Sequence, residues 1–166
     1  MKVAILIPTF ERSSFIQRLI NYYDSLKCPH IIYIGDASNK KISDTTKEFL
    51  RNIKNVKVKY FHWENLNVMH TISKLAEEAS NECSYCTFQG DEDFFIPSSL
   101  TRCAKFLSDN PEYTTVQGRA IQVIMNSNHP TGNIKFIREY WAENSLENDD
   151  KIKRLSLFND KPFAMQ

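Results

Sequence analysis

The sequence predicts an α/β fold with a mostly parallel central sheet and helices on both faces. Short apolar runs rich in β-branched residues alternate with helical patterns of about 10–15 residues, which is typical of βαβ units. The length of 166 residues fits one domain, and 42% hydrophobic with 25% charged residues is the composition of a folded chain. We expect this domain over residues 1–125, with a short irregular and helical tail of the same domain over 126–166.

The expected strands differ in burial. Continuous apolar runs at 3–7 and 31–34 indicate strands that are buried on both faces. Alternation of apolar residues with lysines at 56–61 indicates an edge or half-exposed strand. Further strands are expected at 85–88 and within 114–124.

Apolar residues at three- and four-residue steps predict helices at 14–26, 43–54, 68–82 and 97–107. The first helix would begin with a capping box from Ser14 to Gln17 and stop before Pro29. Beyond the fifth strand the pattern weakens. Residues 126–133 have the composition of a loop, and short helices are expected at 137–144 and 149–159.

Composition and charge narrow the function classes. The 21 Lys and Arg against 20 Asp and Glu give a net charge of +1, so no excess charge points to nucleic acid or an anionic membrane as main partner. With only 4 glycines, a glycine-rich phosphate-binding loop is nearly excluded. No stretch approaches the roughly 18 apolar residues of a membrane span, and the apolar start is too short for a signal peptide.

The four cysteines are interpreted as buried structural thiols in a reducing cytoplasm. Cys83 and Cys86 have the C-x-x-C spacing of zinc and redox sites, which are the alternatives. A structural zinc site needs a second pair of ligands, and none follows at suitable spacing. A redox pair should open a helix after a strand, whereas this pair lies where a helix is expected to end.

Candidate ligand-binding residues follow the ends of three expected strands, because open α/β sheets bind ligands outside the carboxyl ends of their strands. These segments are Pro8-Thr9-Phe10-Glu11-Arg12, Gly35-Asp36-Ala37-Ser38 and Gly90-Asp91-Glu92-Asp93. Gly35 and Gly90 each precede an acidic residue, where glycine permits tight turning and close approach of a ligand.

Asp91, Glu92 and Asp93 form the most distinctive feature. Three adjacent carboxylates repel one another unless a positive group balances them, and Mg²⁺ or Mn²⁺ prefers such oxygen ligands. The alternative is an acidic turn before a helix, since acidic residues favour helix N-termini. The packed segment Phe94-Phe95-Ile96-Pro97 that follows, and the position at the ligand-binding edge, favour a metal site.

Asp36, together with Thr9 and the acidic residues, is a candidate for holding a nucleotide base or ribose by hydrogen bonds. Positive charge for a diphosphate could come from Arg12 and Lys74. The alternative for both is a solvated position on a helix.

Three segments resemble family 2 glycosyltransferases of the GT-A fold. Val3 to Arg12 resembles their opening strand and Pro-Thr-Tyr-Asn-Arg turn, with Glu11 in place of Asn. Ile34 to Ser38 resembles their Asp-Asp-Gly-Ser segment, with Gly35 and Ala37 as departures. Phe88 to Pro97 resembles their Asp-x-Asp metal motif and its downstream proline. The resemblance covers residues 1–125.

The resemblance implies a Rossmann-like GT-A sandwich with a nucleotide-sugar site. The nucleotide of a UDP-sugar or a similar donor would be held by the first turn and the second strand end, and Mn²⁺ or Mg²⁺ would bridge the diphosphate. The implied donor-binding residues are Pro8, Thr9, Glu11, Arg12, Asp36, Ser38, Lys74 and Asp91. The implied metal ligands are Asp91 and Asp93, with Glu92 as the alternative if the register slips by one.

The catalytic base of the family comes from the part after the fifth strand, and no residue here matches a motif for it. Carboxylates are available at Glu139, Glu143, Asp149 and Asp150. About 40 residues remain there, so we expect a short or truncated acceptor region.

The sequence therefore predicts transfer of a sugar from a nucleoside-diphosphate-sugar to an acceptor hydroxyl with a divalent metal, in polysaccharide or glycolipid biosynthesis. The acceptor would be a saccharide or a lipid-linked sugar, and peripheral membrane association and a homo-oligomer are both compatible with the sequence. The alternative is a truncated or non-catalytic GT-A domain that binds a nucleotide-sugar or a partner. Receiver and dehalogenase-like domains are disfavoured, because Pro8-Thr9 stands where they place an aspartate.

Overall fold

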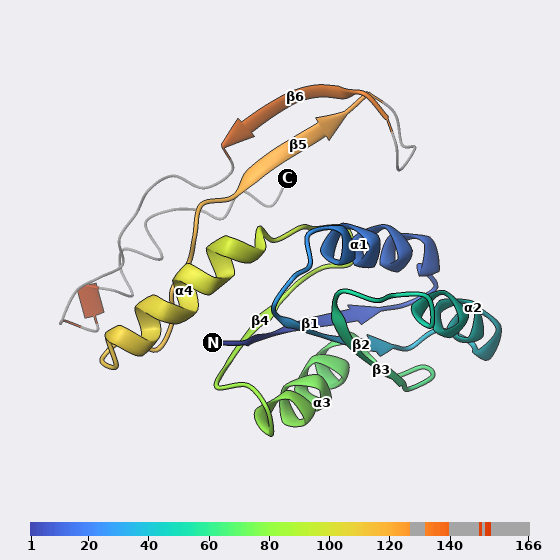
Figure 1. Ribbon diagram of the computed structural model, residues 1–166, viewed down its shortest axis with the longest axis horizontal. Coiled ribbons are helices and arrows are strands. Elements are labelled where there is room, and N and C mark those ends of the chain that lie inside the picture. Colours follow the sequence, from blue (N-terminus) through green and yellow to red (C-terminus); the bar gives the residue numbers. More distant parts are fainter. Residues whose placement is uncertain (127–131, 140–149, 151, 154–166) are drawn as a thin grey trace. The chain divides into compact units, whose positions relative to one another are not determined.

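A parallel sheet of four strands forms the centre of the first of two units, Met1–Gly118 and Arg119–Gln166, into which the chain divides (Figure 1). The computed structural model describes residues 1–126, 132–139, 150 and 152–153. The strands are β1 (Val3–Thr9), β2 (Ile31–Asp36), β3 (Lys57–His62) and β4 (Tyr85–Phe88), in the order β3-β2-β1-β4. All neighbouring pairs are parallel, which confirms the predicted fold class.

The register brings the strand ends together at one edge. Thr9 at the end of β1 lies opposite Asp36 at the end of β2, which in turn lies opposite His62. β4 stops earlier, but the backbone N–H of Gln89 continues the ladder by donating to the Leu6 carbonyl at 3.0 Å. The turn after β4 therefore starts beside the last residues of β1.

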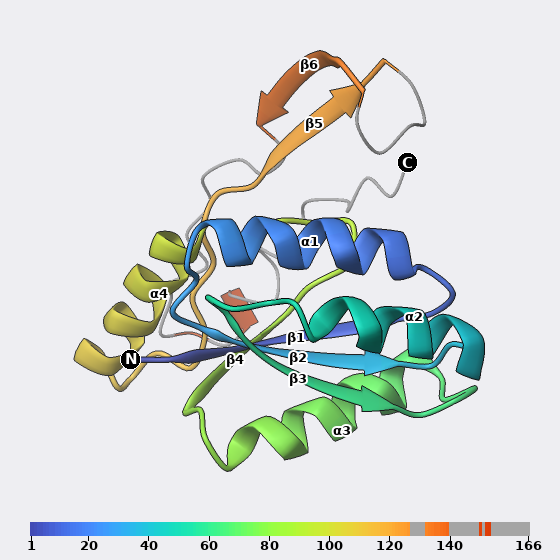
Figure 2. The same ribbon diagram turned by 45° about the vertical axis from the view of Figure 1, so that its right-hand side comes forward.

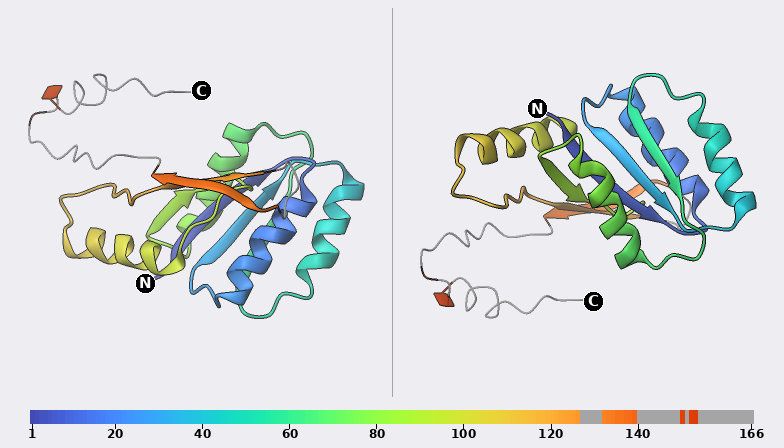
Figure 3. Two further views of the ribbon diagram at one scale, coloured as in Figure 1. Left: turned by 90° about the horizontal axis from the view of Figure 1, so that it is seen from above. Right: turned by 90° about the horizontal axis from the view of Figure 1, so that it is seen from below.

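Helices cover both faces of this sheet. The helices α1 (Ser13–Ser25) and α2 (Lys40–Leu50) lie on one face and α3 (Val68–Ser80) lies on the other (Figures 2 and 3). Side chains of β1 alternate between two cores: Ile5 and Ile7 pack with α1, whereas Ala4 and Leu6 pack with α3. Both faces of β1 are buried, as its continuous apolar run predicts.

Helix α4 (Pro97–Asp109) follows the turn after β4 and begins at the proline that the sequence pattern indicates. Pro is favoured at this first position because its missing N–H would have no partner inside the helix. None of the helices in the described part of the chain is long and apolar enough to cross a membrane.

Two predicted helix starts are wrong. Helix α1 begins at Ser13 after Arg12, and no side chain caps it, so the capping box at Ser14 does not form. Helix α2 begins three residues early, at Lys40, because the Asn39 side chain accepts a hydrogen bond from the Ile42 N–H. An Asn at this position satisfies one of the free N–H groups of the first turn.

The second unit contains a two-stranded antiparallel sheet of β5 (Ile121–Met125) and β6 (Ile134–Glu139). The predicted fifth strand is shorter than expected, since residues 114–120 form no regular structure. The helix expected at 137–144 is wrong at its start, where 137–139 belong to β6. The rest of that helix, and most of the one expected at 149–159, lie outside the described residues.

Candidate functional site

A cavity of about 270 Å³ opens at the strand ends of the first unit. The turns after β1, β2 and β4 and the start of α3 form its wall. Its polar lining residues are Thr9, Arg12, Thr71, Asp91 and Glu92, and the others are Pro8, Phe10, Ala37, Leu66, Val68, Phe88 and Gly90. This edge is where open α/β sheets bind ligands. The cavity therefore brings together five of the predicted site residues: Pro8, Thr9, Arg12, Asp91 and Glu92.

Asp91 lines this cavity and is only 3% exposed. The Thr9 hydroxyl donates to Asp91 Oδ2 at 2.8 Å, so the end of β1 is joined directly to the turn after β4. Burial raises the pKa of Asp91 to about 6, and the adjacent Glu92 carboxyl pushes it in the same direction. A buried carboxylate is costly without a positive partner, and Arg12 provides one.

Arg12 balances two of the three clustered carboxylates. Its Nη1 lies 2.7 Å from Asp91 Oδ1 and 2.9 Å from Glu92 Oε2. The contact with Asp91 is the chief cause that lowers the pKa of Glu92, and Arg12 adds to it. Both ion pairs use the same nitrogen, so neither occupies Nη2 or Nε. Arg12 is thus placed at the cavity as predicted, but its partners here are carboxylates.

Phe15 and Arg18 lie next to Arg12 and the acidic turn of Asp91 to Asp93, and sequence reasoning missed both. The guanidinium of Arg12 stacks on the Phe15 ring at 4.0 Å, and that of Arg18 lies 5.0 Å from the same ring. Arg18 Nη2 also lies 3.5 Å from the Glu92 carbonyl oxygen. The signal was the spacing: residues three apart near the start of a helix share one face.

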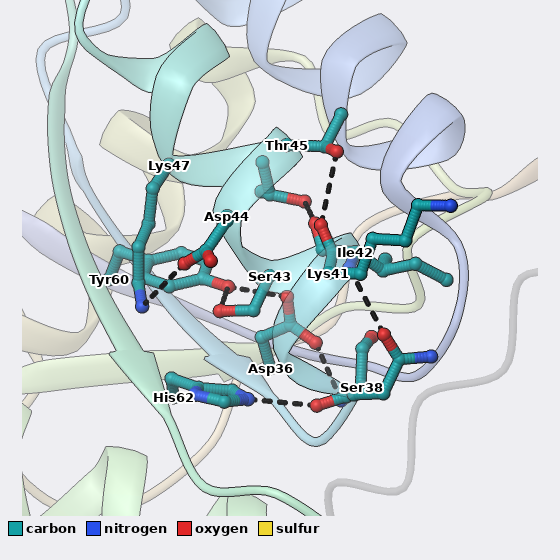
Figure 4. A network of polar contacts seen from close by, with 12 residues as sticks. Asp36, Ser38, Lys41, Ile42, Ser43, Asp44, Thr45, Lys47, Tyr60 and His62 are labelled. Carbon is teal, nitrogen blue, oxygen red and sulfur yellow. Dashed lines mark hydrogen bonds and ion pairs between the residues drawn. The ribbon is translucent and has the colours of Figure 1, made fainter.

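Asp36 does not line the cavity, and its side chain lies towards α2 and β3 (Figure 4). Asp36 is 1% exposed, and its carboxylate accepts hydrogen bonds from the Ser38 N–H at 2.8 Å and from the Tyr60 hydroxyl. The Tyr60 oxygen also lies 2.9 Å from Ser43 Oγ. Burial raises the pKa of Tyr60, and Asp36 adds to this because the phenol donates to its carboxylate. Asp36 therefore anchors the turn that contains Ser38.

Glu11 and Ser38 tie the first two strand ends together. The Glu11 N–H donates to Ser38 Oγ at 2.7 Å, and Glu11 Oε1 accepts from the backbone and side-chain nitrogens of Asn39 at 3.0 and 2.8 Å. Glu11 adopts the left-handed conformation with φ of 58°. A non-glycine residue costs energy there and persists only where its surroundings hold it, as these three bonds do.

Lys74 and Gly35 do not line the cavity. Lys74 lies on α3, and its Nζ is 5.1 Å from the centre of the Trp63 ring. Neither Gly35 nor Gly90 has a positive φ, so no tight turn requires these glycines. A Cβ on Gly35 would lie 2.4 Å from Thr71 Cγ2, so this glycine lets α3 approach β2 closely.

The family is decided by comparison with known sequences. The family model described as glycosyl transferase family 2 matches residues 4–165. The chain belongs to glycosyl transferase family 2. The predicted relationship is confirmed, and the match extends beyond the expected residues 1–125. No curated protein matches the chain.

A solved structure agrees with a GT-A fold for this family 2 chain. TarS 1–349 of S. aureus in complex with UDP-GlcNAc superposes with a TM-score of 0.51 at 18% identity, over 73% of this chain and 33% of that one. Another structure of TarS 1–349 gives a TM-score of 0.49 at 16% identity, over 78% and 38%. The chain spans about a third of the length of these TarS structures.

The acidic turn of this family 2 chain is not a complete metal site by itself. Within residues 1–126 and the shorter described segments, no three His, Cys, Asp or Glu side chains converge as metal ligands. Glu92 and Asp93 are exposed as whole residues. The pKa of Asp93 is still raised, because its carboxyl group is partly desolvated and lies near the negative charge of Glu92. Asp93 is not among the residues that line the cavity.

Of the acidic residues considered for the catalytic base, two are described. Glu139 is exposed at the end of β6, 3.8 Å from Arg119, and Asp150 Oδ1 accepts a hydrogen bond from the Ile152 N–H at 2.9 Å. Glu143 and Asp149 lie outside the described residues.

The prediction of buried thiols is correct for Cys28 alone. Cys83 and Cys103 are half-buried, Cys86 is exposed, and all four cysteines are free. Cys86 is exposed because it lies on β4, at the edge of the sheet.

Proposed function

We propose that this chain binds a nucleoside-diphosphate-sugar at the strand-end cavity and transfers the sugar to an acceptor hydroxyl. The observation that carries the proposal is that Asp91 accepts a hydrogen bond from Thr9 and forms an ion pair with Arg12, at the carboxyl edge of a family 2 sheet. A UDP-sugar is the donor we propose, supported by the complex of TarS with UDP-GlcNAc. The acceptor would be a saccharide or a lipid-linked sugar of polysaccharide or glycolipid synthesis.

The cavity has both apolar and charged lining residues, and each kind suits one part of the donor. Apolar side chains of Phe10, Leu66 and Val68 suit the faces of a nucleoside. The diphosphate would lie towards Arg12, whose Nη2 and Nε are not used in its ion pairs. Glu11 and Ser38 would hold the first turn in place. A direct contact between Asp36 and the nucleotide requires that Tyr60 turn away.

A divalent metal, Mn²⁺ or Mg²⁺, fits the donor chemistry of the Asp-x-Asp-like turn. Mg²⁺ is commonly bound by one or two carboxylates together with substrate phosphates, so a complete protein cage is not required. Asp91, Glu92 and Asp93 would hold the ion. When bound, it supplies positive charge that stabilises the leaving nucleoside diphosphate. Arg12 would help to balance the charge of this turn before and after the donor binds.

A second candidate function is binding of the nucleotide-sugar without transfer. The carboxylates among the lining residues of the cavity are Asp91 and Glu92, and both contact Arg12. Neither is therefore free to deprotonate an acceptor hydroxyl, which transfer with inversion requires. For either function, we propose that the protein is cytoplasmic, which the four free thiols support.

Calorimetric titration with UDP, with and without Mn²⁺, tests the proposed site. We expect metal-dependent binding that is lost when Asp91 and Asp93 are both changed to Ala. Asp109→Ala is the matched control, since this exposed residue on α4 contacts only Lys105 among the ion pairs observed. Unchanged metal-dependent binding in the double variant would show that the site lies elsewhere. Hydrolysis of a UDP-sugar by the wild type then separates transfer from binding alone.

A further inference from the structure

We propose that Tyr23 and Gln89 are positioning residues that hold the acidic turn, Asp91 to Asp93, in the shape that binds the donor diphosphate. The inference rests on the proposed function, because it takes this turn as part of the donor site. Neither residue lines the cavity. They would act through the backbone of the turn.

Tyr23 and Gln89 bracket the end of the turn with three hydrogen bonds. The Tyr23 hydroxyl donates to Gln89 Oε1 at 2.7 Å and accepts from the Phe95 N–H at 3.1 Å. Gln89 Nε2 donates to the Asp93 carbonyl oxygen. The phenol from α1 thus reaches both the residue before the turn and the segment after it, across 66 and 72 residues of sequence.

The burial of this pair makes its polar groups significant. Tyr23 is 0% exposed and Gln89 is 2% exposed. Buried polar groups cost energy unless they are hydrogen-bonded, and an apolar residue of similar volume would fill the same space without that requirement. Here the two side chains hydrogen-bond to each other and to the backbone of residues 93 and 95. Their polarity therefore serves the shape of the turn.

The turn needs support of this kind, because it has little of its own. Residues 89–96 form no helix or strand, and one backbone hydrogen bond, from the Asp93 N–H to the Gly90 carbonyl at 3.2 Å, closes the turn. Repulsion among the three carboxylates favours a more open arrangement. The groups of a binding site must be held within about 0.5 Å of the geometry that binds the ligand. Buried residues that hydrogen-bond to the segment carrying these groups hold them there.

The test compares two buried tyrosines. Tyr23→Phe keeps the ring and removes the hydroxyl beneath the turn. Tyr33→Phe is the matched control: Tyr33 is also 0% exposed, but its hydroxyl donates to Glu82 at 3.2 Å, after the end of α3. Each variant is measured by thermal unfolding, by titration with UDP and Mn²⁺, and by hydrogen exchange of residues 90–96 without ligand.

We expect Tyr23→Phe to bind UDP with Mn²⁺ about tenfold more weakly, as expected for a loss of one to two hydrogen bonds, whereas Tyr33→Phe keeps wild-type affinity. Exchange over residues 90–96 should rise in Tyr23→Phe alone. Gln89→Met has a similar volume and removes the bond from Tyr23 together with the bond to the Asp93 carbonyl. It should behave as Tyr23→Phe does and replaces it if that variant does not fold. Wild-type affinity and exchange in both variants would overturn the positioning role. Failure of the wild type to bind UDP would instead overturn the proposed function.

Discussion

At the scale of residues, hydrogen bonds between distant parts of the chain hold the side chains near the strand ends. The position of Asp91 after a strand end was predictable because it follows an apolar strand and a glycine. The orientation of Asp36 was not, since Tyr60, 24 residues away on β3, decides it. Tyr23 and Gln89 were missed for the same reason: their bond joins residues 66 apart.

One buried histidine gives a prediction at this scale. His30 is 1% exposed; its Nδ1 accepts from the Val3 N–H at 3.2 Å, and its Nε2, which then carries the proton, lies 3.0 Å from the Pro97 carbonyl. Burial lowers the pKa of His30 below its usual 6.5. The folded protein thus resists protonation, while the unfolded chain takes up a proton below about pH 6.5.

The contribution of His30 to the free energy of unfolding should therefore be complete above pH 6.5 and fall below it, by at most about 1.4 kcal/mol per pH unit. Urea unfolding from pH 7.5 to 5 should show a wild-type advantage over His30→Gln that shrinks with acidity. The comparison of the two proteins cancels the carboxyl groups, whose titration they share. The exposed His70→Gln serves as control. An advantage that does not change with pH would contradict this account of His30.

At the scale of elements, hydrophobic patterns located the buried strands well. Continuous apolar runs predicted β1 and β2, because strands buried on both faces need apolar residues on both. The start of α2 was missed, since the cap at Asn39 lies outside the apolar pattern. The last residues of β6, 137–139, were predicted as the start of a helix because a short apolar segment fits both periods.

The packing of α3 on β2 gives the prediction at this scale. Gly35→Ala places a Cβ 2.4 Å from Thr71 Cγ2, a buried methyl group, so α3 or the Thr71 side chain must shift. We expect the free energy of unfolding to fall by about 1–3 kcal/mol in denaturant titration.

Thr71→Ser, which removes that methyl but keeps a hydroxyl for the Asn67 carbonyl, should recover part of this loss in the double variant. Equal stability of Gly35→Ala and the wild type would show that α3 is not held this closely.

At the scale of the whole molecule, the donor site is proposed within the first unit alone. The family and the GT-A fold of the chain follow from the match over residues 4–165 and the likeness to the complex of TarS with UDP-GlcNAc. The second unit contributes a two-stranded sheet with exposed apolar side chains at Ile121, Ile134 and Ile137. Sequence patterns were weakest there, because a short hairpin lacks the long periodic segments that identify helices and buried strands.

The most direct test of the central claim is a crystal structure with UDP and Mn²⁺, using anomalous diffraction to locate the metal. The account predicts UDP in the strand-end cavity with its diphosphate towards Arg12, and one Mn²⁺ peak beside the carboxylates of Asp91, Glu92 and Asp93. A UDP bound away from this cavity, or bound within it with no metal at the acidic turn, would contradict the account.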